Sequence, residues 1–271
     1  MSSFPLNPSP RRHWFCALVS LMALAVIASA AVPNRISPPV YLHSAIATTD
    51  EHGQTLRPDT ALTLPLTLEV DKQGLACVVL PNGVALLLEA GTRLRLEEVS
   101  LNAPVNEAQW NDPRYEPTQS VTRLNLERGT IAIAGKTPNP TSVFTVSTPL
   151  GQITSEAKRW TLSLTPEILT LAVADGTVNV LPRDQPASDF IQSGQSAIIT
   201  RTGLITGRPL TIERTTAADS RDNDAALARA TIGLGDTAFI PENETSVQPH
   251  RIFIEQKLRA RPVDDHAIRR Q

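Results

Sequence analysis

The sequence predicts an all-β protein, because short stretches of alternating apolar and polar residues recur along it and are separated by glycine and proline turns. The pattern is clearest over residues 142–200, where the alternating stretch "LTLAVADGTVNV" surrounds the pair Asp175-Gly176. The chain holds 22 prolines and 13 glycines among 271 residues. The strand-like stretches do not alternate with helix-length segments, which argues against a parallel α/β sheet.

The first strands are expected from about residue 61 onwards. Residues 32–60 are rich in proline and threonine and have weak periodicity, so we expect a linker or an irregular lead-in there. The stretch "LTLPLTLEV" then alternates, although Pro65 favours an edge or bulged strand. "LACVVL" and "VALLL" follow, and Pro81-Asn82-Gly83 is the turn expected between them.

Two similar stretches come next, "TRLRLEEV" from Thr92 and "TRLNLERGTIAIAG" from Thr122. In the second we expect a turn at Glu127-Arg128-Gly129. Further along, Pro149-Leu150-Gly151 is a turn between two strands. Asp175-Gly176, flanked by alternating apolar residues, predicts a tight hairpin. These segments define a β domain over residues 61–212.

The C-terminal part, residues 213–271, is less regular, and we expect a poorly ordered extension there. Residues 205–216 are compatible with one more strand. Asp222 or Asn223 is a suitable N-cap for a short helix that ends before Gly233.

The N-terminus predicts export. Arg11 and Arg12 precede an uncharged apolar run from Trp14 to Ala31 that ends in small residues. This pattern is typical of a secretory signal peptide, with residues 1–31 as the leader. At about 18 residues the run also lies at the lower limit for spanning a bilayer, so an uncleaved anchor is the alternative. We therefore expect a periplasmic or extracellular protein, which contacts the membrane only if this segment is retained.

Composition narrows the classes of function. The formal net charge is −2 and aromatic residues make up 4% of the chain, which argues against a nucleic-acid partner. Cys77 is the only cysteine outside the leader, and its apolar neighbours predict a buried, inert thiol. The histidines have no metal-binding spacing, and no serine lies in a G-x-S-x-G frame. We expect no enzyme, no catalytic or metal-binding residues and no cofactor.

Several of these segments, in this order, resemble the FecR-type domain. "LPNGVALLLEAGTRLRL", from Leu80, is similar to the opening of that domain, and "VTRLNLERGTIAI", from Val121, is similar to its next step. "FTVSTPLGQITSEAKRWTLSL", from Phe144, resembles the family's "F-x-V-x-T-P-x-G" segment, and "LTLAVADGTVNV" and "IQSGQSAIIT" resemble its closing pair. The resemblance implies a β-sandwich, a β-roll or a short β-solenoid of stacked strands, with an irregular C-terminal extension.

The sequence departs from the family pattern in two places. Ala157-Lys158 stands where the family usually has glycine and threonine, so we expect that turn to be built differently. Residues 97–120 form an insertion, which contains Trp110 and Tyr115. A loop this long in a compact domain is usually functional or disordered. Trp110 either fastens the loop to the sheet or, with Tyr115, contacts a partner.

The FecR resemblance implies a regulatory role only in part. Family regulators join a cytoplasmic anti-sigma region to a periplasmic domain, and some ten residues before the apolar run are too few for such a region. We therefore predict a non-enzymatic extracytoplasmic FecR-domain module that binds or scaffolds an envelope protein or glycan. The alternative is a membrane-anchored periplasmic arm of a cell-surface signalling system with a separate cytoplasmic regulator. A carbohydrate-active enzyme is disfavoured, because the sequence offers no convergent carboxylates.

Overall fold

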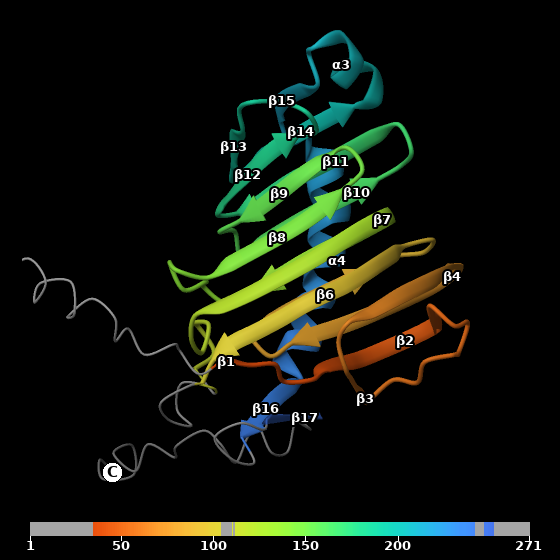
Figure 1. The fold of residues 1–271 in the computed structure, drawn as a ribbon, viewed down its shortest axis with the longest axis vertical. Helices are drawn as coiled ribbons and strands as arrows, with labels where there is room; N and C mark the ends of the chain where they lie inside the picture. The colour runs from red at the N-terminus through yellow and green to blue at the C-terminus, as the bar shows by residue number, and fades with distance from the viewer. Residues whose placement is uncertain (1–34, 104–109, 111, 242–246, 252–271) are drawn as a thin grey trace, which may run out of the picture. The chain divides into compact units, whose positions relative to one another are not determined.

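The all-β prediction is confirmed by the structure, a computed structural model that describes residues 35–103, 110, 112–241 and 247–251. Figure 1 shows the strands crossing the molecule in successive rows, with one long helix behind them. The narrower assignment to a FecR-like sandwich, roll or solenoid stays a prediction. The predicted leader, residues 1–31, lies outside the described residues.

The N-terminal strands are β1 (Arg35–Ile36), β2 (Val40–Asp50), β3 (Thr60–Leu62), β4 (Leu66–Leu80), β5 (Val84–Leu88), β6 (Arg93–Asn102) and β7 (Ser120–Gly135). The middle strands are β8 (Val143–Thr148), β9 (Gly151–Ser155), β10 (Arg159–Leu164), β11 (Ile168–Asp175), β12 (Thr177–Pro182), β13 (Asp189–Gln192) and β14 (Gln195–Thr200). The C-terminal elements are α3 (Arg201–Thr206), β15 (Leu210–Arg214), α4 (Ala217–Gly235), β16 (Thr237–Pro241) and β17 (Val247–Arg251).

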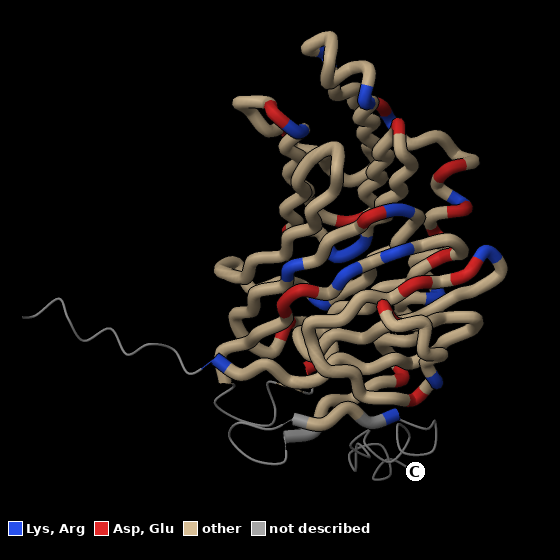
Figure 2. Tube along the Cα trace, turned by 45° about the vertical axis from the view of Figure 1, so that its right-hand side comes forward, with Lys and Arg blue, Asp and Glu red and all other residues tan. Residues whose placement is uncertain are grey.

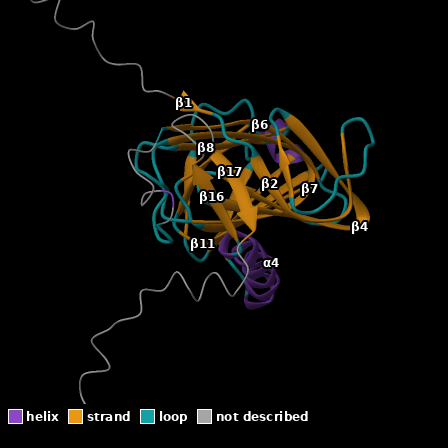
Figure 3. Ribbon diagram, turned by 90° about the horizontal axis from the view of Figure 1, so that it is seen from below, coloured by secondary structure: helices purple, strands orange, loops and turns teal. Residues whose placement is uncertain are grey.

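The long strands β4 and β7 connect two layers. Along their first parts both strands pair with β6, and along their second parts both pair with β5. The first layer continues from β7 through β8, β9 and β12 to β13. The second continues from β7 through β10, β11 and β14 to β15. Figure 3 shows the strands around a common interior, with α4 outside them.

The core lies between these layers. Alternate residues of β7 and β10, such as Ile133 and Trp160, point inward and are almost fully buried. Phe144 of β8 meets Trp160 of β10 edge-on, with ring centroids 6.1 Å apart, which joins the two layers.

Helix α4 covers the outer face of the second layer. Thr216 caps it by accepting a hydrogen bond from the Asp219 backbone N–H at 3.2 Å. Its small buried residues Ala226 and Ala230 let the helix approach the sheet closely. The prediction of a short helix capped at Asp222 or Asn223 is wrong in extent: the helix begins earlier, at Ala217, and runs on to Gly235.

A linker was expected over residues 32–60, and the described part of it, residues 35–60, does not form one. These residues contain β2, which pairs with both the first and the second part of β4. In β2, Val40 and Leu42 are buried. The register of β2 shifts at His43 and again at Ala47, which has a φ of +46°. These two bulges break the period of two, and a weak period was the reason for expecting a linker.

The C-terminal prediction also needs correction. The extra strand expected within residues 205–216 is present as β15. The segment predicted as poorly ordered contains α4 and the two-stranded ribbon of β16 and β17. Residues 252–271 lie outside the described residues.

At two places where a turn was expected, the chain does not fold back on itself. At Glu127-Arg128-Gly129 the strand β7 continues, and Gly129, with a φ of +93°, bends it against Thr92. Asp175-Gly176 makes no hairpin, because β11 and β12 pair with other strands in different layers. Gly176 has a φ of +107°, and a Cβ on it would lie 2.5 Å from the Cα of Ala157. The positive φ at this close approach is therefore held by Gly176 rather than by residues 157–158.

Other local predictions are confirmed. The turn Pro81-Asn82-Gly83 joins β4 to β5, with the Gly83 N–H donating to the Leu80 carbonyl at 3.0 Å. Pro149-Leu150 joins β8 to β9, with Thr148 opposite Gly151. Cys77 is buried, and burial raises the pKa of its thiol to about 12, which fits an inert side chain.

Candidate binding groove

The insertion is shorter than the sequence suggested, because β6 runs to Asn102 and β7 begins at Ser120. Its two aromatic residues lie in different environments. Trp110 is buried, with 6% of its surface exposed, and belongs to the hydrophobic core. Tyr115 is 53% exposed, and the guanidinium of Arg114 lies 5.3 Å from its ring centroid. The structure therefore does not bring the two predicted contact residues together.

Trp110 lines a groove of about 400 Å³, a size within the range of ligand-binding clefts. Three parts of the chain that are distant in sequence form it: the turn between β4 and β5, the insertion, and the segment from the end of α4 into β16. We call this the Trp110 groove; its apolar side chains are Val79, Pro81, Trp110, Pro113, Leu234, Ala238 and Phe239.

Lys136 is the cation in the lining of the Trp110 groove. It follows β7 directly, and its backbone N–H donates to the Gly83 carbonyl at 3.0 Å, which fixes it beside the β4–β5 turn. Its Nζ lies 3.4 Å from the Trp110 carbonyl oxygen. Burial lowers the pKa of Lys136, since its ammonium is partly removed from water.

The charge of Lys136 has no carboxylate partner among the residues that the structure describes. Asp112, the nearby acid that favours the charged form of Lys136, is itself 3.4 Å from Arg114. The two threonines of the lining have their hydroxyls bound within the chain. Thr231 donates to the Leu227 carbonyl at 2.8 Å, and Thr237 donates to the Gly233 carbonyl at 2.9 Å. Among the lining side chains, Lys136 is thus the charged group available to a ligand.

A second, smaller cavity of about 30 Å³ lies across the β4–β5 turn and also touches Lys136. Its main polar group is Glu116, whose carboxylate accepts from the Asn139 N–H at 2.7 Å, from the Ser142 hydroxyl at 2.6 Å and from the Ser120 hydroxyl. Burial raises the pKa of Glu116 in spite of these bonds. The cavity holds about one or two water molecules. It is therefore a packing feature that fastens the insertion to β7 and β8.

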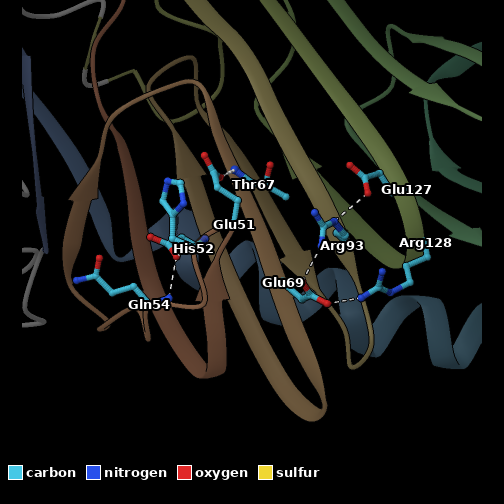
Figure 4. Close-up of polar contacts among 9 residues, drawn as sticks. Glu51, His52, Gln54, Thr67, Glu69, Arg93, Glu127 and Arg128 are labelled. Atoms are coloured by element: carbon cyan, nitrogen blue, oxygen red, sulfur yellow. Dashed lines mark hydrogen bonds and ion pairs between the residues drawn. The ribbon is translucent and has the colours of Figure 1, made fainter.

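A cluster of charged side chains lies on the first layer and is shown in Figure 4. Arg93 pairs with Glu69 at 2.8 Å and with Glu127 at 2.8 Å, and Glu69 also pairs with Arg128. Figure 2 shows basic and acidic residues side by side across these strands. Their charges are used within the network, so it offers less to a charged partner than the Trp110 groove.

The described residues also bear on metal binding and on membrane crossing. No group of three histidine, cysteine, aspartate or glutamate side chains in this part of the chain could hold a metal ion. No helix there is long and apolar enough to cross a membrane.

Sequence reasoning identified Trp110 but missed Lys136, Leu234 and Phe239. Lys136 is a single lysine after an apolar strand, a pattern that is common on protein surfaces. Leu234 and Phe239 lie in the segment that was expected to be poorly ordered. An apolar run such as "TAFIP" at 237–241 after a helix was the one available signal.

Comparisons with known proteins gave few matches. No family model matches the chain, and no curated protein matches it in sequence. Two crystal structures of a proposed anti-sigma factor from Parabacteroides distasonis resemble it, at 12% and 11% identity, with TM-scores of 0.42 and 0.41. Each covers 69% of this chain and 99% of its own. The FecR-type resemblance of the β domain therefore stays a prediction.

Proposed function

We propose that this chain is a non-enzymatic extracytoplasmic module of the FecR type, which binds a partner protein of the cell envelope at the Trp110 groove. The observation that carries the proposal is the groove itself, an apolar cleft of about 400 Å³ with one partly buried ammonium, that of Lys136, which has no carboxylate partner among the described residues. Clefts with apolar walls and few polar groups are the usual places for specific binding.

An envelope partner follows from the leader. Arg11-Arg12 and the apolar run to Ala31 are expected to direct the chain out of the cytoplasm. A protein partner suits the groove better than an envelope glycan, because sugars are held by exposed aromatic faces and many hydrogen bonds. Here Trp110 and Phe239 are both buried, with 6% and 7% of their surfaces exposed. The walls of the groove are mostly apolar and can accept apolar side chains of a partner.

Site-specific photocrosslinking in cells tests the proposal. A photoreactive amino acid in place of Thr231, an exposed residue of the groove, is expected to capture one defined partner. The matched control is the same probe in place of Asp222, which is exposed on α4 about 13 Å along the helix axis. Equal crosslinking from both positions, or none from Thr231, would contradict a partner site in the groove.

The second candidate is a membrane-anchored periplasmic arm of a signalling system. The observation that favours it is the apolar run from Trp14 to Ala31, which is long enough to span a thin bilayer. N-terminal sequencing of the exported protein separates the two proposals. A mature N-terminus near Ala31 supports the soluble module, whereas a retained leader supports the anchored arm.

A further inference from the structure

Strand β16 has one edge that is not used in the described sheet. It pairs with β17 along its full length, Thr237 opposite Arg251 and Pro241 opposite Val247, and no other described strand pairs with it. The free edge of a strand carries backbone N–H and C=O groups that can accept another extended chain. Pro241 has no N–H, so the donors of this edge lie within residues 237–240.

The Trp110 groove runs along this strand. Three consecutive residues of β16, Thr237, Ala238 and Phe239, line it. Side chains of a strand alternate between its two faces, so a cleft that touches three residues in succession follows the backbone as well as one face. The groove therefore offers backbone hydrogen-bonding groups together with apolar walls.

Lys136 adds a fixed positive charge to the same groove. Its stem packs beside the β4–β5 turn, where a Cβ on Gly83 would lie 2.6 Å from the Lys136 Cδ. Among the described residues its ammonium has a carbonyl neighbour but no carboxylate. A partly buried ammonium without a counter-ion favours a ligand that supplies one negative charge.

We propose that the Trp110 groove captures the free C-terminus of a partner protein as an added strand. The last three or four residues of the partner extend along β16, their apolar side chains fill the space between Trp110 and Phe239, and the terminal carboxylate pairs with Lys136. Main-chain bonds to a strand edge give affinity in this mode of recognition, and pockets for alternate side chains give specificity. This inference rests on the proposed function, because it names the part of the partner that occupies the site.

Fluorescence anisotropy with two synthetic peptides tests the inference on the full chain. The probe is an N-terminally labelled octapeptide that has two lysines at its start, ends in alternating alanine and leucine, and carries a free carboxylate. The second peptide is identical but has a C-terminal amide. We expect the acid to bind about tenfold more tightly than the amide, as one charge-assisted hydrogen bond in a partly buried site would give.

Substitutions identify the groups involved. In Lys136→Gln we expect the acid and the amide to bind equally, and in Lys136→Arg we expect the preference for the acid to remain. Lys72→Gln, at an exposed position of β4 outside the groove lining, is the matched control and should keep the tenfold ratio. Far-ultraviolet circular dichroism confirms that each variant is folded. If Lys136→Gln fails to fold, the comparison of acid with amide on the unmodified chain still decides the question.

Two results would overturn the inference. Equal binding of the acid and the amide to the unmodified chain would exclude carboxylate capture. Tighter binding of decanoate than of the acid peptide, seen as displacement at lower concentration, would assign the groove to a lipid instead. Either result leaves the proposed function standing if the probe at Thr231 still crosslinks one protein. Loss of that crosslink would remove the proposed function instead.

Discussion

The two faces of the second layer are built from different side chains. On the inner face, register partners across β5, β7 and β10 are large: Leu86 lies opposite Ile133, and Ile133 opposite Trp160. On the outer face, under α4, the next positions of β7 and β10 are small, with Ala132 opposite Thr161. The inner face fills the space between two sheets about 10 Å apart. The outer face receives a helix whose backbone approaches closely, and small side chains leave room for it.

The contrast teaches that one sheet is apolar on both sides for two separate reasons. Inward residues such as Trp160 are buried by the strands of the first layer, through Phe144. Outward residues are buried by α4, which Thr161 contacts through its hydrogen bond to Asn223. The inner face is thus expected to depend on side-chain volume, and the outer face on the fit of the helix.

Truncation on the inner face should have the largest effect. Trp160→Ala removes a fully buried side chain that contacts both layers, and we expect the free energy of unfolding to fall by about 3–5 kcal/mol. Urea denaturation measures the change. Trp160→Phe is the matched control and should cost less, because it keeps an aromatic ring and removes the indole Nε1, which is buried without a hydrogen-bond partner. Equal losses from both variants would contradict a volume-dependent inner face.

Enlargement on the outer face should cost less. A Cβ added at Gly233 would lie 2.5 Å from the Sγ of Cys77, so Gly233→Ala forces α4 away from β4. We expect a loss of about 1–3 kcal/mol in the free energy of unfolding, as overpacking usually costs. The background Cys77→Ala removes the clashing sulfur, and the added cost of Gly233→Ala should largely disappear there. A double-mutant cycle with no coupling would show that the helix does not press on this point.

The same two faces show what the sequence could reveal. The inner face produces strict alternation, such as Leu162 and Leu164 in β10, and this alternation predicted most strands of residues 61–212. Turns closed by local chemistry, such as Pro81-Asn82-Gly83, were also predictable. Strand pairing across layers was not, because Asp175-Gly176 has the composition of a hairpin turn whether the next strand folds back or crosses over.

The outer face and the Trp110 groove were harder to foresee. Helix α4 begins with the polar run "AADSRDND", and its buried residues are alanines, a glycine and a single large residue, Leu227, so it lacks the wide apolar stripe that indicates a helix. The groove depends on Trp110, Lys136 and Phe239, which the fold brings together from distant parts of the chain. No local pattern encodes such a meeting, and only Trp110 was identified from the sequence.

A hydrogen bond between sheet and helix should have a smaller effect than either packing change. The Thr161 hydroxyl donates to the Asn223 side-chain oxygen at 2.9 Å, and Thr161→Val would leave that oxygen without this donor. We expect a loss of about 1 kcal/mol in the free energy of unfolding. Ser163→Ala, which removes a hydroxyl bound to Thr130 on the same strand pair, is a control that does not involve α4. The two substitutions are compared by urea denaturation and by limited proteolysis of α4. If Ser163→Ala destabilises α4 as much as Thr161→Val does, the bond to Asn223 does not help to hold the helix.

The smallest effect is expected from pH, and it also distinguishes the two faces. His43 of β2 lies near Gly233, at the C-terminal end of α4, and its Nδ1 is buried without a hydrogen-bond partner. Burial, and then the charge of Arg251, lower the pKa of His43 below its ordinary value of 6.5, while Asp236 and Asp59 oppose the shift. The unfolded chain therefore takes up the proton first as the pH falls. The free energy of unfolding should be constant at pH values above the ordinary pKa of 6.5. It should fall as the pH decreases from there to the lowered pKa of His43.

Urea midpoints measured from about pH 8 to about pH 5 give the dependence of stability on pH. This pH range covers the titration of histidine. His43→Gln should lower stability at every pH but flatten the decline, since glutamine has no proton to gain. Arg251→Gln should make the decline smaller and end it at a higher pH, because it removes a charge that lowers the pKa of His43. Parallel slopes for the unmodified chain and His43→Gln would mean that some other group controls how the outer face responds to acid.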